Sequence, residues 1–330
     1  MTGRRPGEEG LIARFFRPLA TSPGAALLLD DVATVPHVEG RELVVTTDAI
    51  VAGVHFFPDD PPDAIARKAL RVNLSDLAAK GARPAGYLVT LALPRDWTVD
   101  WLEGFVEGLA ADQEEFGVSL LGGDTVRTPG ALWISVTALG YAPEGHVPRR
   151  NGAAPGQRLY VTGTIGDAAL GLLLRQDESL ALTWDLRRAD KEWLLDRYLL
   201  PEPRLSLAAV VSAYATASMD ISDGLVGDAG KLASASRVGA LINASRTPLS
   251  RAASRAVAAD REALAVALTG GDDYELLLAI DPDDADAFES DAAAAGVPVT
   301  DIGALVEGGG VSVEANGRPL DLGAGSFAHF

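Results

Sequence analysis

Apolar residues recur along the chain with two periods, one typical of helices and one typical of strands. Apolar positions three or four apart between residues 11 and 19 predict a short helix near the N-terminus. Short β-branched runs predict strands, and longer runs with helical spacing predict helices. In the first half of the chain, strands are expected at 43–47, 87–93, 118–121 and 132–141, and helices at 63–80 and 99–116.

Residues 143–156 are rich in Pro, Gly and Arg, which indicates a boundary between two halves. Beyond this segment the alternation of strands and helices starts again. The expected elements are a strand at 159–162, a helix from about 167 to 175, a helix within 201–218, a polar turn at 220–224, a helix from there to about 236, a strand at 276–280, a helix within 281–295, and short strands and turns over 297–330. This pattern predicts an α+β fold with mixed α/β layers and two domains, 1–147 and 148–330.

Composition narrows the chemistry. The chain has 330 residues, with 46 acidic and 28 basic side chains, so its formal charge is −18. This charge disfavours a nucleic-acid partner, because phosphates are repelled where no basic patch attracts them. The absence of cysteine excludes disulfides, zinc–thiolate sites, iron–sulfur clusters and a cysteine nucleophile. No segment has the pattern of a membrane span or export signal, so a cytoplasmic protein is expected.

Many aspartates lie at predicted strand ends, glycine turns and helix termini, where functional residues concentrate. Mg²⁺ prefers oxygen ligands, and carboxylates that bridge to substrate phosphates supply them. For any single aspartate, capping or turn formation is the simpler interpretation. The residues at such positions are Asp30, Asp31, Asp48, Asp76, Asp124, Asp220, Asp223, Asp272 and Asp273.

Three of these positions invite a specific interpretation in the first half. Asp48 ends a predicted strand, and the nearby His55 is, taken alone, typical of a hydrogen-bonded structural histidine. Asp76 shares a helix face with Asn73, so the pair faces either the core, where it needs a partner or a metal, or the solvent. Two glycines before Asp124 allow a ligand to approach the backbone closely.

In the second half, residues 220–224 open a predicted helix. Its first backbone N–H groups, together with Ser222, are suited to an anion, and Asp220 and Asp223 are suited to that anion's metal. Helix capping by Ser222 or Asp223 is the alternative. The Walker A loop, dinucleotide fingerprint and nucleophile elbow are all missing, so phosphate chemistry has to rest on carboxylates and a metal.

Taken in order, several segments resemble those of thiamine-monophosphate kinases, a family in the superfamily of aminoimidazole ribonucleotide synthetase and selenophosphate synthetase. The resemblance spans nearly the whole chain. Its segments are LLDDVATV, VVTTDAIVAGVHF, KALRVNLSDLAAKGARP, LLGGDT, RRNGAAPGQRLYVTGTIGD, MDISDGLVGD, GGDDYELL and the terminal GSFAHF.

The resemblance implies an aminoimidazole ribonucleotide synthetase-like fold. It also implies direct in-line transfer of the γ-phosphoryl group of ATP to thiamine monophosphate, without a nucleophilic side chain. It implies a homodimer whose N-terminal sheets join in a barrel, with ATP bound between the two halves of each chain.

The resemblance also implies roles for individual residues. The Mg²⁺ ligands would be Asp31, Asp48, Asp76, Asp124, Asp220 and Asp223, with Thr47 assisting. ATP would contact Thr46, Gly123, Arg150 and Ser222, besides the metal-binding Asp124. Thiamine monophosphate would contact His55, Asp272 and Phe327, with Phe327 stacking on a thiamine ring.

Four positions depart from the family pattern: Leu29 replaces a glycine, Lys80 a methionine, Val126 a threonine and Asp272 a glutamate. None removes an implied metal ligand. The missing cysteine also separates the chain from selenophosphate synthetases and hydrogenase-maturation relatives, which use one. Two alternatives remain: a synthetase of the same superfamily with another small acceptor, and a non-catalytic protein that binds divalent cations or nucleotide.

Overall fold

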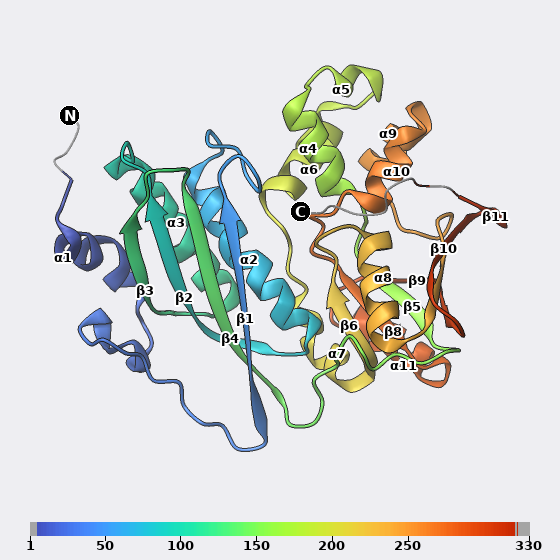
Figure 1. Cartoon of the computed structure of the whole chain (residues 1–330), viewed down its shortest axis with the longest axis horizontal. Helices are drawn as coiled ribbons and strands as arrows, with labels where there is room; N and C mark the ends of the chain where they lie inside the picture. The colour runs from blue at the N-terminus through green and yellow to red at the C-terminus, as the bar shows by residue number, and fades with distance from the viewer. Residues whose placement is uncertain (1–4, 321, 323–330) are drawn as a thin grey trace. The chain divides into compact units, whose positions relative to one another are not determined.

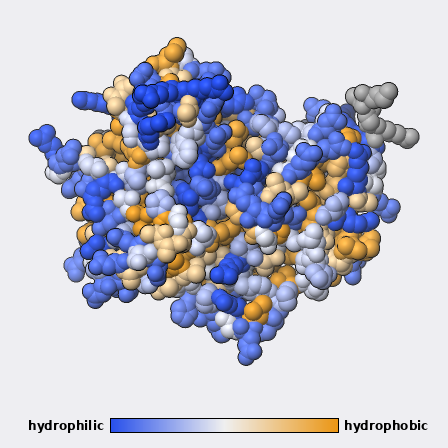
Figure 2. Space-filling view, turned by 180° about the vertical axis from the view of Figure 1, so that it is seen from behind, coloured by the Kyte–Doolittle hydropathy of each residue, from blue (hydrophilic) through white to orange (hydrophobic). Residues whose placement is uncertain are grey.

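A computed structural model of the chain describes residues 5–320 and residue 322, in two units that are considered separately. The first unit comprises Met1–Leu77 and Arg83–Glu144, and the second comprises Ala78–Ala82 and Gly145–Phe330. Within the described part of the chain, no helix combines the length and apolarity needed to cross a membrane. Hydrophilic side chains lie between apolar ones over the face seen in Figure 2.

A four-stranded sheet forms the centre of the first unit, with strand order β1-β4-β2-β3. Strand β4 is antiparallel to β1 and β2, and β2 is parallel to β3. Two long helices, α2 and α3, cover one face of this sheet (Figure 1). The elements are α1 (Glu8–Leu11), η1 (Ile12–Phe16), η2 (Arg17–Leu19), η3 (Pro23–Leu28), β1 (Arg41–Val51), α2 (Pro62–Ala79), β2 (Arg83–Leu93), α3 (Val99–Phe116), β3 (Leu120–Arg127) and β4 (Trp133–Pro143).

Helix α3 has the ends that its sequence predicts. The Thr98 side chain accepts a hydrogen bond from the Trp101 N–H at 3.1 Å, which caps the first turn. At the other end Gly117 takes a left-handed conformation with φ 64°, which glycine adopts at no steric cost. Leu102, Phe105 and Leu109 are buried on the same side of the helix.

A buried carboxylate joins α2 to α3. The fully buried Asp112 accepts hydrogen bonds from Arg67 Nε at 2.7 Å and from Arg71 Nε and Nη2, both at 2.8 Å. Arg71 is also nearly buried, and it reaches Glu115 at 2.7 Å. Because charges removed from water need partners, this network fixes the two helices against each other.

The sheet face away from α2 carries exposed apolar side chains, and we call it the open face. Residues paired across strands point to the same side, so the register assigns Leu43, Val45, Leu88 and Val126 to this face. They are 37–56% exposed. Residues 20–35 contribute apolar side chains that pack on Leu121 and Leu139 and cover part of the sheet.

A seven-stranded mixed sheet forms the centre of the second unit, with strand order β11-β10-β7-β9-β5-β8-β6. The strands are β5 (Arg158–Thr162), β6 (Ala215–Asp220), β7 (Gly239–Asn243), β8 (Leu276–Ile280), β9 (Val299–Val306), β10 (Gly310–Ala315) and β11 (Arg318–Pro319). The helices are α4 (Asp167–Gln176), α5 (Leu180–Thr183), α6 (Arg188–Leu199), η4 (Leu205–Leu207), α7 (Ala208–Tyr214), α8 (Leu225–Ser236), α9 (Arg251–Ala259), α10 (Glu262–Thr269), η5 (Pro282–Asp284) and α11 (Ala285–Ala294).

Strand β8 is apolar throughout because it is buried on both faces. Leu277 and Ala279 pack in a core with Leu225 and Leu232 of α8. Leu276, Leu278 and Ile280 point the other way, into a core with residues of α7 and α11. Both faces of the strand are therefore covered, which requires a continuous apolar run instead of alternation.

A short segment between the two parts of the first unit, residues 78–82, belongs to the second unit. Ala78 and Ala79 are fully buried in the core that also holds Tyr160, Leu207 and Phe288. Lys80 Nζ donates a hydrogen bond to the Ser218 carbonyl. The lysine that replaces the family's methionine therefore has a defined backbone partner.

The predicted α+β fold with mixed layers is confirmed, while several predicted elements have other limits. Asp48 lies inside β1, and Gly122 to Asp124 lie inside β3 and not in a turn, because β3 continues its pairing with β2 as far as Arg127. The helix expected within 201–218 ends at Tyr214, because the following residues pair with β8 as strand β6. Sequence patterns did not predict α6, α9, α10 or β7.

Replacement of Asp112 by alanine is expected to lower the free energy of unfolding by about 3–5 kcal/mol, because it leaves the nearly buried Arg71 without its main counter-charge. The matched control is Glu115→Ala, which removes a half-exposed carboxylate from the same network and should cost about 1 kcal/mol or less. Denaturant unfolding of both variants measures the difference. Equal losses would show that Asp112 does not carry the network.

Candidate functional site

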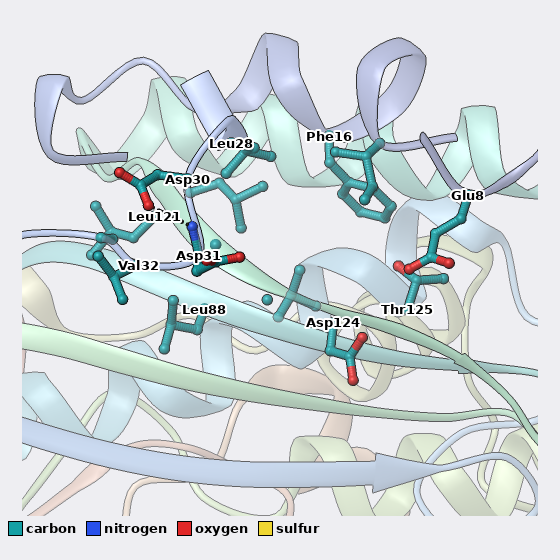
Figure 3. Close-up of a pocket in the computed structure, with 16 residues that line it drawn as sticks. Glu8, Phe16, Leu28, Asp30, Asp31, Val32, Leu88, Leu121, Asp124 and Thr125 are labelled. Carbon is teal, nitrogen blue, oxygen red and sulfur yellow. Dashed lines mark hydrogen bonds between the residues drawn. The ribbon is translucent and has the colours of Figure 1, made fainter. Parts of the chain in front are cut away.

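Acidic residues of the N-terminal segment and of β3 line a cavity of about 600 Å³ in the first unit. Asp30 and Asp31 come from the segment after η3, Asp124 and Thr125 from β3, and Glu8 from α1 (Figure 3). The apolar side chains of Phe16, Leu28, Val32 and Leu88 also line it. The cavity therefore combines several carboxylates with an apolar wall, an arrangement suited to a cation and a partly apolar ligand.

Gly123 is required by the close approach of two strands beside this cavity. Its φ is 150°, and a Cβ added there would lie 1.8 Å from the Val89 carbonyl oxygen. No larger residue fits without separating β3 from β2. The glycine that the sequence suggested for ligand approach thus has a packing role as well.

The turn before Asp30 accommodates its unusual leucine. Leu29 has φ −106°, a conformation open to any residue, so the loss of the family's glycine does not strain this position. The left-handed conformations occur just earlier, at Ala26, Leu27 and Leu28, with φ between 49° and 56°. The strain in this turn therefore precedes the position at which the sequence departs from its family.

A second polar group lies between β1 and α2. Thr46 Oγ1 donates a hydrogen bond to the Asp76 carboxylate, and the Asp48 N–H donates one to Asn73 Oδ1 at 2.9 Å. Asn73 is fully buried, and its amide also donates to the Ala69 carbonyl at 3.0 Å. Asn73 and Asp76 thus face the sheet and not the solvent.

The register separates these two groups. Asp48 is paired with Val136, Val136 with Val89, and Val89 with Gly123, so Asp124 points to the face opposite that of Asp48. Thr47 points away from Asp48 in the same way, and its hydroxyl accepts a hydrogen bond from Thr137 at 3.1 Å. Within one first unit, the implied metal ligands therefore lie on both faces of the sheet.

In the second unit, the turn at 220–224 is held against the loop at 270–275 by backbone hydrogen bonds. The N–H groups of Asp272 and Tyr274 donate to the carbonyls of Ser222 and Ile221, both at 2.8 Å. The Ile221 N–H donates to the Glu275 carbonyl at 2.8 Å. The structure thus brings together Ser222 and Asp272, which sequence analysis had assigned to separate motifs.

Two backbone N–H groups of the turn before α8 already hold an anion, which is a side chain of the protein. Asp228 Oδ2 accepts hydrogen bonds from the N–H groups of Ser222 at 3.0 Å and Asp223 at 2.9 Å. The Asp228 carboxylate is fully buried, and this burial raises its pKa. The N–H groups of Ser222 and Asp223 are therefore occupied by this carboxylate.

Other implied ligand contacts have structural partners or lie elsewhere. His55 Nδ1 accepts the Val51 N–H at 3.1 Å in the turn after β1, as expected of a structural histidine. Arg150 is exposed, and its carbonyl accepts a hydrogen bond from Ser236 Oγ at 2.7 Å. Asp220 is buried at the end of β6. Phe327 lies outside the described residues.

Sequence analysis named Asp273 but missed Glu275, Arg204 and Thr162, which support the loop at 270–275. The nearly buried Glu275 accepts hydrogen bonds from Arg204 Nε at 2.7 Å and Thr162 Oγ1 at 2.5 Å. Asp273 accepts the Gly166 N–H at 2.9 Å, and burial raises its pKa well above its ordinary value. The acidic run from 272 to 275 was the signal in the sequence that could have indicated these side chains. Their hydrogen-bond partners, however, are distant in sequence.

The carboxylates suit Mg²⁺ in chemistry, although they form no complete cage. Among residues 5–320 and 322, no group of three or more acidic or histidine side chains is arranged to hold a metal ion. Mg²⁺ is usually held by one or two protein carboxylates together with substrate phosphates. The pair Asp31 and Asp124 at the cavity, and the half-exposed Asp223, fit that requirement as oxygen donors.

Gly271→Ala is expected to disrupt the pairing of the two loops. The residue has φ 76°, and a Cβ there would lie 2.4 Å from the Ser222 carbonyl oxygen. The control is Gly296→Ala, which has φ 77° but open space around the added carbon, so it isolates the conformational cost of about 1 kcal/mol. Thermal unfolding should show a clearly larger loss for Gly271→Ala. Equal losses would mean that the loops can separate without cost.

Comparisons with known proteins place the chain in a family. Residues 29–142 match the N-terminal domain of AIR synthase related proteins, and residues 154–316 match the C-terminal domain. The thiamine-monophosphate kinase of Caulobacter vibrioides is 46% identical over 96% of this chain and 88% of its own length.

Solved structures agree with this assignment. Thiamine-monophosphate kinase from Stenotrophomonas maltophilia is 38% identical, covers 95% of this chain and 98% of its own, and has a TM-score of 0.81. A structure described as AaThiL complexed with AMPPCP and TMP is 32% identical over the full length of both chains, with a TM-score of 0.76. The chain is therefore a member of the thiamine-monophosphate kinase family, within the AIR synthase related proteins.

Proposed function

We propose that the protein transfers the γ-phosphoryl group of ATP to thiamine monophosphate and so forms thiamine diphosphate and ADP. The observation that carries this proposal is similarity over nearly the whole chain to thiamine-monophosphate kinases. The related structure with AMPPCP and TMP gives the same pair of ligands. A biosynthetic reaction that consumes ATP is consistent with a cytoplasmic location.

In this proposal Mg²⁺ neutralises the phosphates and aligns the donor with the acceptor. Asp31, Asp48, Asp76, Asp124, Asp220 and Asp223 are the proposed ligands, with Thr47 assisting. The chain's contribution is to hold these carboxylates on rigid strands and turns, so that two phosphate-bearing substrates meet without mutual repulsion. Because the chain has a charge of −18, it needs such cations before it can bind two substrates that carry negatively charged phosphates.

Further contacts are proposed for the two substrates. Thr46, Gly123, Arg150 and Ser222 would contact ATP. His55, Asp272 and Phe327 would contact thiamine monophosphate, and the shorter side chain of Asp272 is expected to alter affinity for that substrate. The proposed domains are 1–147 for ATP, metal and dimer contacts, and 148–330 for the C-terminal half.

The open face of the first unit supports a homodimer. Its exposed Leu43, Val45, Leu88 and Val126 lie on the same face of one sheet, together with polar residues such as Thr47 and Asp124. The proposed occupant is the same face of a second copy, whose sheet would pack on this one. Such pairing would leave Asp48 and Asp76 on the outer, α2-covered side of each sheet.

The kinase assay is the first test. The protein, ATP, Mg²⁺ and thiamine monophosphate should yield thiamine diphosphate, and Asp124→Asn should lower kcat by about 100-fold, because a metal ligand supplies several kcal/mol of transition-state stabilisation. Asp100→Asn, at an exposed position in the first turn of α3, is the matched control and should keep kcat within about twofold. Both variants are measured by product chromatography.

The outcomes separate the competing hypotheses. ADP release with another small phosphate or amide, but not with thiamine monophosphate, would favour a synthetase of the same superfamily. Binding of ATP or Mg²⁺ without turnover of any acceptor would favour a non-catalytic binding protein. Equal activity of the two variants would remove Asp124 from the site.

The dimer has a separate test. Val45→Lys places a charge on the open face, so it should convert the dimer to a monomer. Leu182→Lys introduces the same charge at another exposed apolar position, in the second unit, and should leave the dimer intact. Light scattering coupled to size exclusion gives the mass of each. A monomeric wild-type protein would refute the proposed dimer.

A further inference from the structure

Lys231, in the middle of α8, lies between one carboxylate in the first half of that helix and one in the turn before it. Its Nζ donates a hydrogen bond to Asp228 Oδ1 at 2.8 Å and another to Asp223 Oδ2. Asp228 is one turn earlier on the same helix, whereas Asp223 belongs to the preceding turn. One ammonium group therefore joins the helix to the turn that carries the proposed metal ligands.

The two carboxylates differ in their freedom to change partners. Asp228 is fully buried and is fixed by the N–H groups of Ser222 and Asp223. Asp223 is about one-third exposed, and its carboxylate reaches the solvent. Asp228 is consequently a permanent part of the fold, and Asp223 can exchange its ammonium partner for another cation.

Lys231 itself can leave without unfolding the helix. Its side chain is 41% exposed, and four methylene groups connect the ammonium to a backbone that α8 holds in place. The ammonium can therefore move into solvent while the stem stays on the helix. Its departure leaves Asp228 with two backbone donors.

We propose that Lys231 is a positioning residue that holds Asp223 when no divalent cation is bound and is displaced from Asp223 when one binds. The proposal rests on the proposed role of Asp223 as a Mg²⁺ ligand. Lys231 supplies one positive charge to the turn in the metal-free protein, so the carboxylates do not repel each other. The same charge opposes cation binding, and Lys231 thereby sets the concentration at which Mg²⁺ occupies Asp223.

The first experiment measures Mn²⁺ binding to the metal-free full-length protein by electron paramagnetic resonance. Lys231→Met should lower the Kd for Mn²⁺ roughly three- to tenfold, since it removes a competing charge a few ångströms from the ion. It should also lower the melting temperature of the metal-free protein, because Asp228 loses its counter-charge. Lys231→Gln keeps a hydrogen-bond donor but no charge, and it should bind Mn²⁺ more tightly in the same way.

Lys191→Met is the matched control. Lys191 pairs with Glu178 at 3.1 Å in the same unit, so its loss removes an equal charge from another ion pair. It should leave the Kd for Mn²⁺ unchanged.

The second experiment observes the displacement directly. The chain has four lysines, Lys68, Lys80, Lys191 and Lys231, so their ¹³C-methylated signals are few enough to assign by substitution. Titration with Mg²⁺ should shift the signal of Lys231 and leave that of Lys191 in place. Thermal unfolding of the unmethylated protein with and without Mg²⁺ checks that the fold is unchanged.

An unchanged or higher Kd in both Lys231 variants would overturn the proposal, as would a Lys231 signal that Mg²⁺ does not move. Absence of Mn²⁺ binding in the wild-type protein would overturn it as well. The kinase assay distinguishes a failure of the proposed role of Lys231 from a failure of the proposed function. Thiamine diphosphate formation with an unchanged Kd refutes only the role of Lys231, whereas absence of product refutes the proposed function.

Discussion

A carboxylate that leaves water must find donors, and this constraint organises both units of the protein. Asp112 joins two helices through two arginines, Asp228 joins α8 to the N–H groups of Ser222 and Asp223, and Glu275 anchors a loop through Arg204 and Thr162. Each accepts hydrogen bonds from at least two groups, as the cost of burying a charge requires. Several of the chain's basic residues pair with these buried carboxylates, while others form exposed ion pairs such as that of Arg188 with Glu192.

The alternation of side chains along β-strands decides which of the exposed aspartates meet. A shift of one residue moves a side chain to the other face, so Asp48 and Asp124 cannot meet within one sheet, although both belong to the family's acidic pattern. The cavity collects Asp31 and Asp124, and the helix side collects Asp48 and Asp76. The four-stranded sheet therefore separates these two groups of carboxylates.

Sequence patterns predicted much of the fold because local signals and tertiary contacts agreed there. Helix α3 has its cap, its apolar stripe and its terminal glycine in the printed sequence, and its predicted limits of 99–116 are confirmed. Where tertiary pairing decides, the sequence was insufficient: the glycines before Asp124 suggest a turn, yet β2 holds them in a strand. Helix α6 is polar around most of its surface, so it lacks the stripe that reveals a helix.

The candidate site was predictable as a set of residues but not as an arrangement. Motifs singled out Asp31, Asp124, Ser222 and Asp272, which the structure places at a cavity or at paired loops. Nothing in the sequence indicated that Asp228 accepts the N–H groups of Ser222 and Asp223 or that Lys231 joins it to Asp223. Such contacts depend on which donor lies close to a buried group in the folded protein. The spacing of residues along the chain does not determine this.

The five residues from Ala78 to Ala82 make the second unit discontinuous in sequence. Their alanines complete a core with Tyr160, Leu207 and Phe288, so a fragment beginning at residue 148 would expose that apolar surface to water. Gly81 packs so closely on the rest of the second unit that a Cβ there would lie 2.8 Å from the Ser212 side chain. During synthesis this segment is therefore made long before the rest of the second unit, and it can join its core only when that unit folds. Gene fusion, truncation or exchange of halves at a single junction would separate this insert from its core.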